Sequence, residues 1–296
     1  MNTLHGVIPL VRRELWESPI AFRWTPIAIG VLMLVLLAML AIFTAKIDGQ
    51  QLFTQSMIRE FAANDAEQRA VMMRFALLGF TPLLNTVLML VLFFYLASSL
   101  YDERKDRSIL FWKSLPVSDA ATVISKFLTA ALLAPFIYLL TAAAVQVIAL
   151  IVASAYTLAA GESVWSVVWA PSQLHEIWLT LLIAIPVQAL WALPLYGWLL
   201  LCSAFAPRLP WLIAIAVPGI AGLFQNYIGY LQQGRLPDTN LWTLFLGRIG
   251  NGILPVSFQI NEDSFDASMK TMREFFSMQT VLERLATLNL WLGVLV

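Results

Sequence analysis

Residues 26–45 have the sequence PIAIGVLMLVLLAMLAIFTA, which contains no charged side chain. A helix of roughly 20 apolar residues crosses the hydrocarbon core of a bilayer, so this stretch predicts a membrane-spanning helix. Five further uncharged runs follow: 77–100, 127–153, 177–205, 211–230 and 285–296. The first four are also long enough to cross. The last has only 12 residues, and we expect it to be the beginning of an incomplete sixth span.

The composition of the whole chain agrees with this pattern. Apolar residues make up 60% of the 296 positions and charged residues 12%, and the mean hydropathy is +0.78. Soluble domains contain roughly 45–50% apolar and about 25% charged residues, so a soluble enzyme and a disordered chain are both excluded. We predict an all-α polytopic membrane protein, with a six-span helical bundle at 26–296 behind an amphipathic N-terminal arm at 1–25.

The distribution of Lys and Arg predicts the orientation. The arm, the connection after the second span and the connection after the fourth carry nine basic residues in total, and the opposite connections at 46–76 and 231–284 carry nine as well. The first set lies on roughly half as many residues, and a higher density of basic residues marks the cytoplasmic side. We therefore expect a multi-pass protein of the cytoplasmic (inner) membrane with its N-terminus in the cytoplasm. The 18 basic and 18 acidic residues cancel, which gives no basic footprint for nucleic acid.

Two cytoplasmic segments carry both charges and apolar side chains. In the arm, Val11 and Leu15 are four residues apart and share a helix face between charged neighbours, which is typical of a helix lying in the membrane interface. In the connection at 102–115, seven charges stand between Asp102 and Lys113. A short charged helix between two spans can dock a soluble partner through its charges and its apolar side. A merely solvated positive-inside flank is the alternative for each segment.

The second of these segments resembles the permeases of the type-2 class of ABC exporters. The likeness rests on Asp102-Glu103-Arg104-Lys105, on the run from Ile109 to Trp112, and on Leu115-Pro116-Val117-Ser118 before the next span. The order of elements along essentially the whole chain is similar too, although the family completes six spans and this sequence stops within the last.

The resemblance implies a role for each segment. The coupling helix, which contacts the ATP-hydrolysing subunit in this family, would comprise Asp102, Glu103, Arg104, Lys105, Asp106, Arg107, Ile109, Leu110, Phe111, Trp112, Leu115 and Pro116. The connecting helix beside it would comprise Arg12, Arg13, Glu14, Leu15 and Trp16. Reversing the charges of Glu103 and Arg104 is expected to impair docking without affecting membrane insertion.

The resemblance also implies the partners. Two permease subunits, identical or different, would pair in the lipid membrane, and two copies of an ABC ATP-binding subunit would dock beneath them. This sequence contains no Gly-Lys dipeptide, so it has no Walker A motif and would not be an enzyme by itself. We therefore expect it to carry no cofactor of its own, with ATP used by the partner to drive efflux.

Polar amides within the spans are the candidates for a translocation path. Asn85, Gln225 and Asn226 are the strongest, although amides in membrane helices commonly serve as hydrogen-bonding contacts between helices. The alternative function is a secondary transporter or channel without an ATPase partner. Such proteins usually place ionisable groups inside the spans, and the five complete spans predicted here contain none.

Overall fold

The computed structural model describes residues 3–47, 51–113, 118–233 and 240–250. Every element in these ranges is helical, so the predicted all-α class is confirmed. The expected sixth span at 285–296 lies outside the described residues, as do Leu115 and Pro116 of the expected coupling helix.

The helices follow one another along the chain with short connections, and three of them, labelled η, are single π-helical turns. In order they are α1 (Thr3–Glu17), η1 (Ile20–Trp24), α2 (Thr25–Ile47), α3 (Gln51–Ala63), α4 (Ala66–Leu78), α5 (Thr81–Lys105), α6 (Ser108–Lys113), α7 (Asp119–Leu128), η2 (Thr129–Leu133), α8 (Ala134–Ala159), η3 (Trp165–Trp169), α9 (Ala170–Ser172), α10 (Leu174–Phe205), α11 (Pro210–Gln233) and α12 (Leu241–Gly250).

Several of these helices join into stretches long and apolar enough to cross a membrane. There are five such stretches in the described residues: Ile20–Phe43, Ala66–Lys105, Asp119–Ala159, Trp165–Phe205 and Pro210–Gln232. Each overlaps one of the five complete spans that the sequence predicts. The chain is therefore a multi-pass membrane protein.

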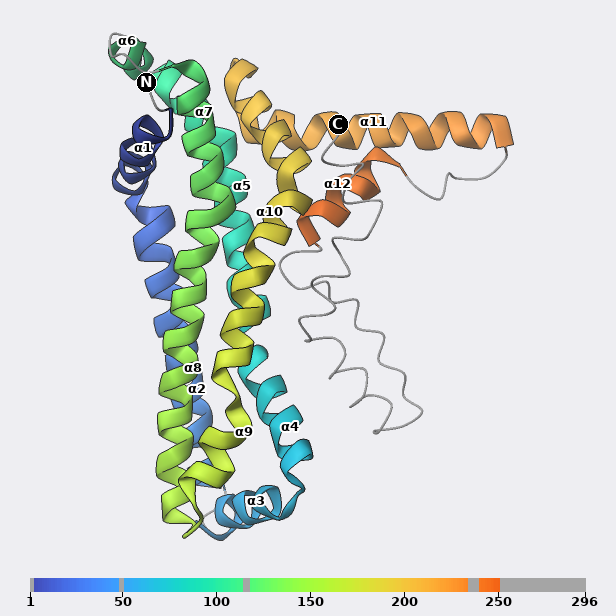
Figure 1. Cartoon of the computed structure of the whole chain (residues 1–296). Coiled ribbons are helices and arrows are strands. Elements are labelled where there is room, and N and C mark those ends of the chain that lie inside the picture. Colours follow the sequence, from blue (N-terminus) through green and yellow to red (C-terminus); the bar gives the residue numbers. More distant parts are fainter. Residues whose placement is uncertain (1–2, 48–50, 114–117, 234–239, 251–296) are drawn as a thin grey trace.

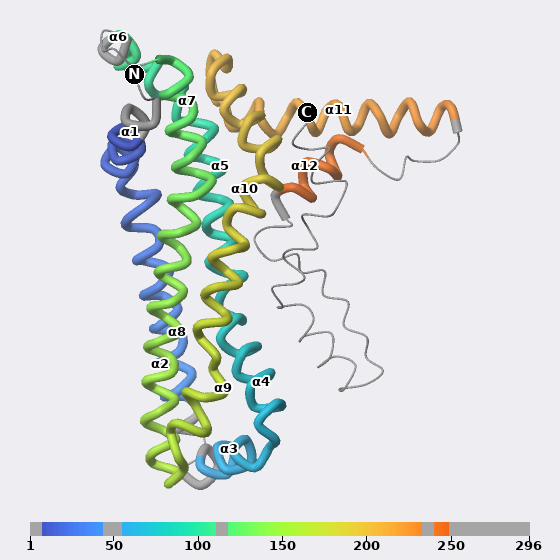
Figure 2. The backbone as a smooth tube through the Cα atoms, in the orientation of Figure 1, coloured from blue at the N-terminus to red at the C-terminus, as the bar shows by residue number. Residues whose placement is uncertain are grey.

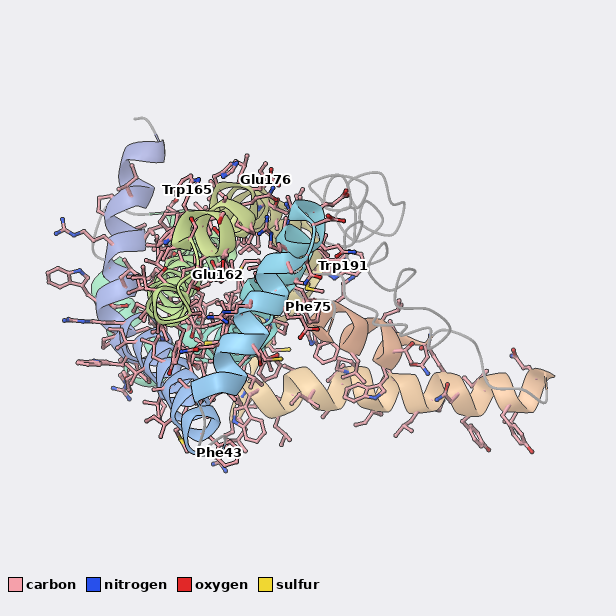
Figure 3. All side chains as sticks on the ribbon, turned by 90° about the horizontal axis from the view of Figure 1, so that it is seen from below. Phe43, Phe75, Glu162, Trp165, Glu176 and Trp191 are labelled. Atoms are coloured by element: carbon pink, nitrogen blue, oxygen red, sulfur yellow. The ribbon has the colours of Figure 1, made fainter. Side chains whose placement is uncertain are left out.

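Four long helices form the body of the molecule (Figure 1). Helix α8 packs against α2 on one side and against α5 and α10 on the other, and α5 and α10 pack against each other. Helices α1, α6 and α7 lie at one end of this bundle, and α3 and α9 lie at the opposite end (Figures 1 and 2). Helix α11 runs across the bundle direction and extends away from it, as the view along the bundle also shows (Figure 3).

The bundle core alternates long and small side chains. Helix α5 contributes Leu84, Leu88, Leu92 and Leu96, which recur every fourth residue and are all buried. Small buried side chains face them from the neighbouring helices: Ala130, Ala131, Ala134, Ala192 and Ala214. Small residues let helix backbones approach closely, and in lipid this close packing replaces the hydrophobic effect as the source of helix association.

Polar side chains fasten the end of the bundle that carries α3. Gln146 is buried in α8, donates from Nε2 to the carbonyl of Leu77 at 3.1 Å, and accepts at Oε1 from Nε1 of Trp178 at 2.9 Å. The Leu77 carbonyl lies at the end of α4, where the helix ladder is interrupted before α5. Gln146 thus has the gluing role expected of an amide in a membrane bundle.

Candidate coupling site at the charged end of the bundle

The structure divides the expected coupling helix into two parts. Residues 102–105 continue α5 to its end, and a separate helix of six residues, α6, follows. Between them the backbone of Arg107 is left-handed, with φ of 57°, which interrupts the helix. The single helix expected at 102–115 is therefore corrected to a helix end, a turn and a short helix at the tip of the bundle (Figure 1).

The charges of this segment point in two directions. Asp102, Lys105, Asp106 and Arg107 are exposed, as is Leu110, whereas Ile109 is half-buried. The side chains of Phe111 and Trp112 lie outside the described part of the structure. The exposed set is the surface available to a partner.

Glu103 faces the interior instead. Its Oε1 atom lies 2.6 Å from Nη2 of Arg13 in α1 and 3.0 Å from Nζ of Lys126 in α7. Glu103 therefore joins the end of α5 to two other helices.

Glu14 and Lys126 form the buried centre of this cluster. Each side chain is only 2% exposed, and Nζ of Lys126 lies 3.0 Å from Oε1 and 3.2 Å from Oε2 of Glu14. Tyr95 of α5 donates its hydroxyl to Oε2 of Glu14 at 2.7 Å, and Phe22 packs edge-on against the Tyr95 ring. A buried ion pair is tolerated only when further hydrogen bonds satisfy its atoms, and here side chains of α5 and α1 supply them.

Arg13 supplies the second positive charge of the cluster, which holds two cations and three carboxylates. Its Nε atom lies 3.0 Å from Glu17, and Nη2 lies 3.3 Å from Glu14. The carboxylate oxygens of Glu14, Glu17 and Glu103 lie within 4.8 Å of one another, close enough to share a cation. Arg13 and Lys126 already provide that positive charge, so the cluster is an ion-pair network. We call these five residues and Tyr95 the α1–α5–α7 cluster.

Arg104 fastens the same end of α5 to α10. Its Nη2 atom donates to the carbonyls of Ser203 and Ala206 at 2.8 and 2.9 Å, at the C-terminus of α10. In return, the Ser203 hydroxyl accepts from the backbone N–H groups of Leu100 and Tyr101. Glu103 and Arg104 thus bind neighbouring helices of the same chain. Reversing their charges would therefore disturb the packing at this end of the bundle and would not test a docking surface.

The expected connecting helix is confirmed as a helix, α1, and it has two faces. Leu10 and Glu14 are buried against α7, with Leu15 and Arg13 partly buried beside them. Arg12 and Trp16 lie on the exposed side, with the Arg12 guanidinium 5.7 Å from the Trp16 ring centre. Such a mixed aromatic and basic face suits the headgroup region of a membrane.

The structure separates the three amides expected to line a path. Oδ1 of Asn226 accepts from Asn240 at 2.9 Å, and Oε1 of Gln225 accepts from the backbone N–H of Leu241 at 2.8 Å. Both amides therefore hold the beginning of α12 against α11. Asn85 instead lies in the bundle between α5, α8 and α10, so its described neighbours differ from those of the other two amides.

Sequence reasoning missed the burial of Glu14 and Lys126. Lys126 stands one residue before the predicted third span, where the sequence predicts only a charge that flanks the membrane. Its partners lie far away in sequence, with 112 positions between Lys126 and Glu14, and no local periodicity reveals such a pair. A lone Lys at the edge of a 27-residue uncharged run (127–153) was the only available signal.

A comparison with known protein families gives a match for part of the chain. Residues 69–192, which run from α4 into α10, match the family model described as ABC-2 family transporter protein. Neither the curated proteins nor the solved structures provide a match. The matched segment contains the end of α5, all of α6 and Lys126. This part of the chain is therefore similar to the membrane domain of ABC-2 family transporter proteins.

Proposed function

We propose that this chain is the transmembrane subunit of an ATP-driven exporter, coupled through α6 to a separate ATP-binding subunit. The observation that carries the proposal is the position of α6. It sits at the tip of the bundle directly after Glu103 and Arg104 (Figure 1), and those side chains bind α1, α7 and α10. A displacement of α6 would therefore be transmitted to α5 and, through these contacts, to α1, α7 and α10.

The proposed docking surface is the exposed half of this segment. Asp102, Lys105, Asp106 and Arg107 offer charges of both signs, and Leu110 offers an apolar contact. Mixed charges around an apolar anchor favour one partner and one register over others. The exposed face of α1, with Arg12 and Trp16, adjoins it as the connecting helix.

We further propose that the N-terminus and α6 lie in the cytoplasm and that the membrane is the inner membrane. The density of Lys and Arg in α1, α6, α7 and their connections supports this orientation. A second permease subunit, identical or different, would complete the transmembrane unit. Two ATP-binding subunits would dock beneath this unit. The exposed apolar side chains along α11, such as Ile220, Leu223 and Phe224, suit lipid and that second subunit.

A secondary transporter is the competing function, and one observation favours it. Glu14 and Lys126 are ionisable and buried, and buried ionisable groups in membrane proteins often serve proton coupling. Glu14 and Lys126 lie at the end of the bundle and bind several side chains there, which agrees better with a role in connecting helices. Transport that follows a proton gradient and ignores ATP would favour the secondary transporter.

Co-purification tests the proposal directly. The tagged chain, extracted gently from membranes, should bring down a Walker A protein with ATPase activity. The double variant Asp102→Lys and Asp106→Lys should release that protein while the permease still folds, because both side chains are exposed. The control Glu60→Lys and Asp65→Lys makes the same change in charge at exposed positions of α3 and the α3–α4 turn, far from α6. Retention of the ATPase by the first variant would contradict docking at this surface.

A further inference from the structure

A small cavity lies inside the bundle between α5, α8 and α10. Its volume is about 30 Å³. Its wall combines Thr81, Asn85 and Tyr138 with apolar side chains, among them Leu84 and Ile185. We call it the mid-bundle cavity.

Three polar oxygen atoms at this cavity have no hydrogen-bond partner among the described residues. They are Oγ1 of Thr81, Oδ1 of Asn85 and the hydroxyl of Tyr138. Thr81 is 7% exposed and Tyr138 is 3% exposed, so bulk water does not reach them. An unpartnered buried polar group costs about 1–3 kcal/mol, and one cavity gathers three of them from two helices.

The cavity lies within the membrane-spanning part of the bundle. Its lining residues Asn85, Leu139 and Ile185 stand at or next to the midpoints of the three stretches Ala66–Lys105, Asp119–Ala159 and Trp165–Phe205. These stretches have 40, 41 and 41 residues. All three residues also lie within the uncharged runs 77–100, 127–153 and 177–205 that the sequence predicts to cross the membrane. At that depth lipid offers no hydrogen bond, so the polar groups need a bound ligand.

The helix ladder is also irregular at this level. Pro135 lines the cavity, and the turn before it, η2, is π-helical. Thr81 begins α5 immediately before Pro82. Proline in membrane helices is commonly accommodated by ordered water and by local changes of helix type, so the surroundings suit a small hydrogen-bonding ligand.

The chemistry of the lining defines the ligand. Two hydroxyls and one amide can both donate and accept hydrogen bonds. None of the described residues that line the cavity is charged, which disfavours an ion because its desolvation would not be compensated. We propose that the mid-bundle cavity binds a neutral hydroxyl group through Thr81, Asn85 and Tyr138. That group is supplied either by resident water or by the head of an amphipathic alcohol. The size suffices for at least one water, which needs roughly 10–15 Å³ and two to four polar partners.

Hydroxyl-radical labelling with X-ray pulses tests this site in the purified full chain in lipid nanodiscs. Radicals form from water and react nearby, so Tyr138 should be labelled far more than Phe22, which is equally buried at 3% exposure but lies away from the cavity. The variant Thr81→Val with Asn85→Leu should lower Tyr138 labelling several-fold. The control Thr86→Val should leave it unchanged, since Thr86 is exposed and donates to the carbonyl of Pro82.

Added 1-octanol separates the two sources of the hydroxyl group. Protection of Tyr138 by 1-octanol but not by n-octane would identify the alcohol head as a ligand, and unchanged labelling would identify water. Both results support the site. Labelling of Tyr138 no stronger than that of Phe22 in the wild-type protein would overturn it. So would labelling that the double variant does not lower. Neither measurement uses the ATPase partner, so a negative result for this cavity leaves the proposed exporter function untouched, and a negative result for the exporter function leaves this proposal untouched.

Discussion

Nζ of Lys126 lies 3.0 Å from Oε1 of Glu14, and both side chains are 2% exposed although 112 positions separate them in sequence. This pair fixes the N-terminal helix α1 to α7, at the beginning of the third long helical stretch. With Glu103 added, it also fixes the end of α5. One small cluster of side chains therefore connects α1, α5 and α7 at this end of the bundle. Helix α6 follows directly after the end of α5 that this cluster binds.

Replacing only Lys126 of the Glu14–Lys126 pair should lower the free energy of unfolding much more than replacing both residues. Lys126→Met leaves the Glu14 carboxylate buried without its main cation, which typically costs about 3–5 kcal/mol. Adding Glu14→Gln removes the orphaned charge and keeps an acceptor for Tyr95, so much of the loss should be recovered. Thermal unfolding of the detergent-purified variants measures both effects. Lys105→Met, at an exposed position of the same end, is the control. A loss for Lys126→Met no larger than for this control would contradict the burial of the pair.

Glu17 should make the stability of this end depend on pH. Burial raises the pKa of Glu17 above its usual 4.5, and the neighbouring Arg13 only partly opposes the shift. The folded state then binds more protons than the unfolded state, so stability is highest below pH 4.5 and falls as pH rises through the folded pKa. Glu17→Gln should reduce this fall, as measured by melting temperatures between pH 4 and pH 7. An unchanged slope would show that Glu17 does not titrate in this way.

The sequence predicted the spans well because their signal is local. A run such as 26–45, without a charge and long enough to cross, needs no partner to be recognised. The end of α5 was not predicted, because Glu103 and Arg104 are kept in the helix by Arg13, Lys126 and the end of α10. These partners lie on other segments. A charge pattern alone therefore could not distinguish the inward Glu103 from the outward Asp102.

The same distinction applies to the predicted path. Gln225 and Asn226 are adjacent in a long apolar helix, and composition gave no means to decide between packing and transport. Their hydrogen bonds to the beginning of α12 supply the packing role. The side-chain oxygen of Asn85 has no partner within the described part of the chain, because its neighbours on α8 and α10 are mostly apolar. Only the three-dimensional arrangement reveals these neighbours.

The close packing of α12 against α11 depends on a glycine, Gly222. A Cβ atom at Gly222 would lie 2.6 Å from Cβ and 3.1 Å from the backbone nitrogen of Trp242. Gly222→Ala should therefore displace α12 and lower the melting temperature. Gly197→Ala in α10 meets nothing within 4 Å among the described residues, so it should be neutral or slightly stabilising. Equal melting temperatures for the two variants would show that α12 does not pack closely at Gly222.

Cysteine labelling on whole cells should establish the orientation. The chain has one cysteine, Cys202, which is buried, so Cys202→Ser provides a background without thiols. In that background Ser163→Cys, at the exposed turn after α8, should react with a membrane-impermeant maleimide from outside. Leu110→Cys should react only after permeabilisation. The reverse pattern would place the N-terminus outside the cell and remove α6 from the reach of a cytoplasmic ATPase.

The central claim is that α6 contacts an ATP-binding subunit, and cross-linking from Leu110 tests it most directly. Leu110 and Leu158 are matched leucines, 66% and 67% exposed, at opposite ends of the bundle. A photoreactive group is attached through Leu110→Cys or Leu158→Cys in the thiol-free background, and the captured proteins are identified by mass spectrometry. The account predicts that a Walker A protein is captured from position 110, that nucleotide changes its yield, and that position 158 captures none. Capture of no ATP-binding protein from position 110, in membranes where the permease is folded, would contradict it.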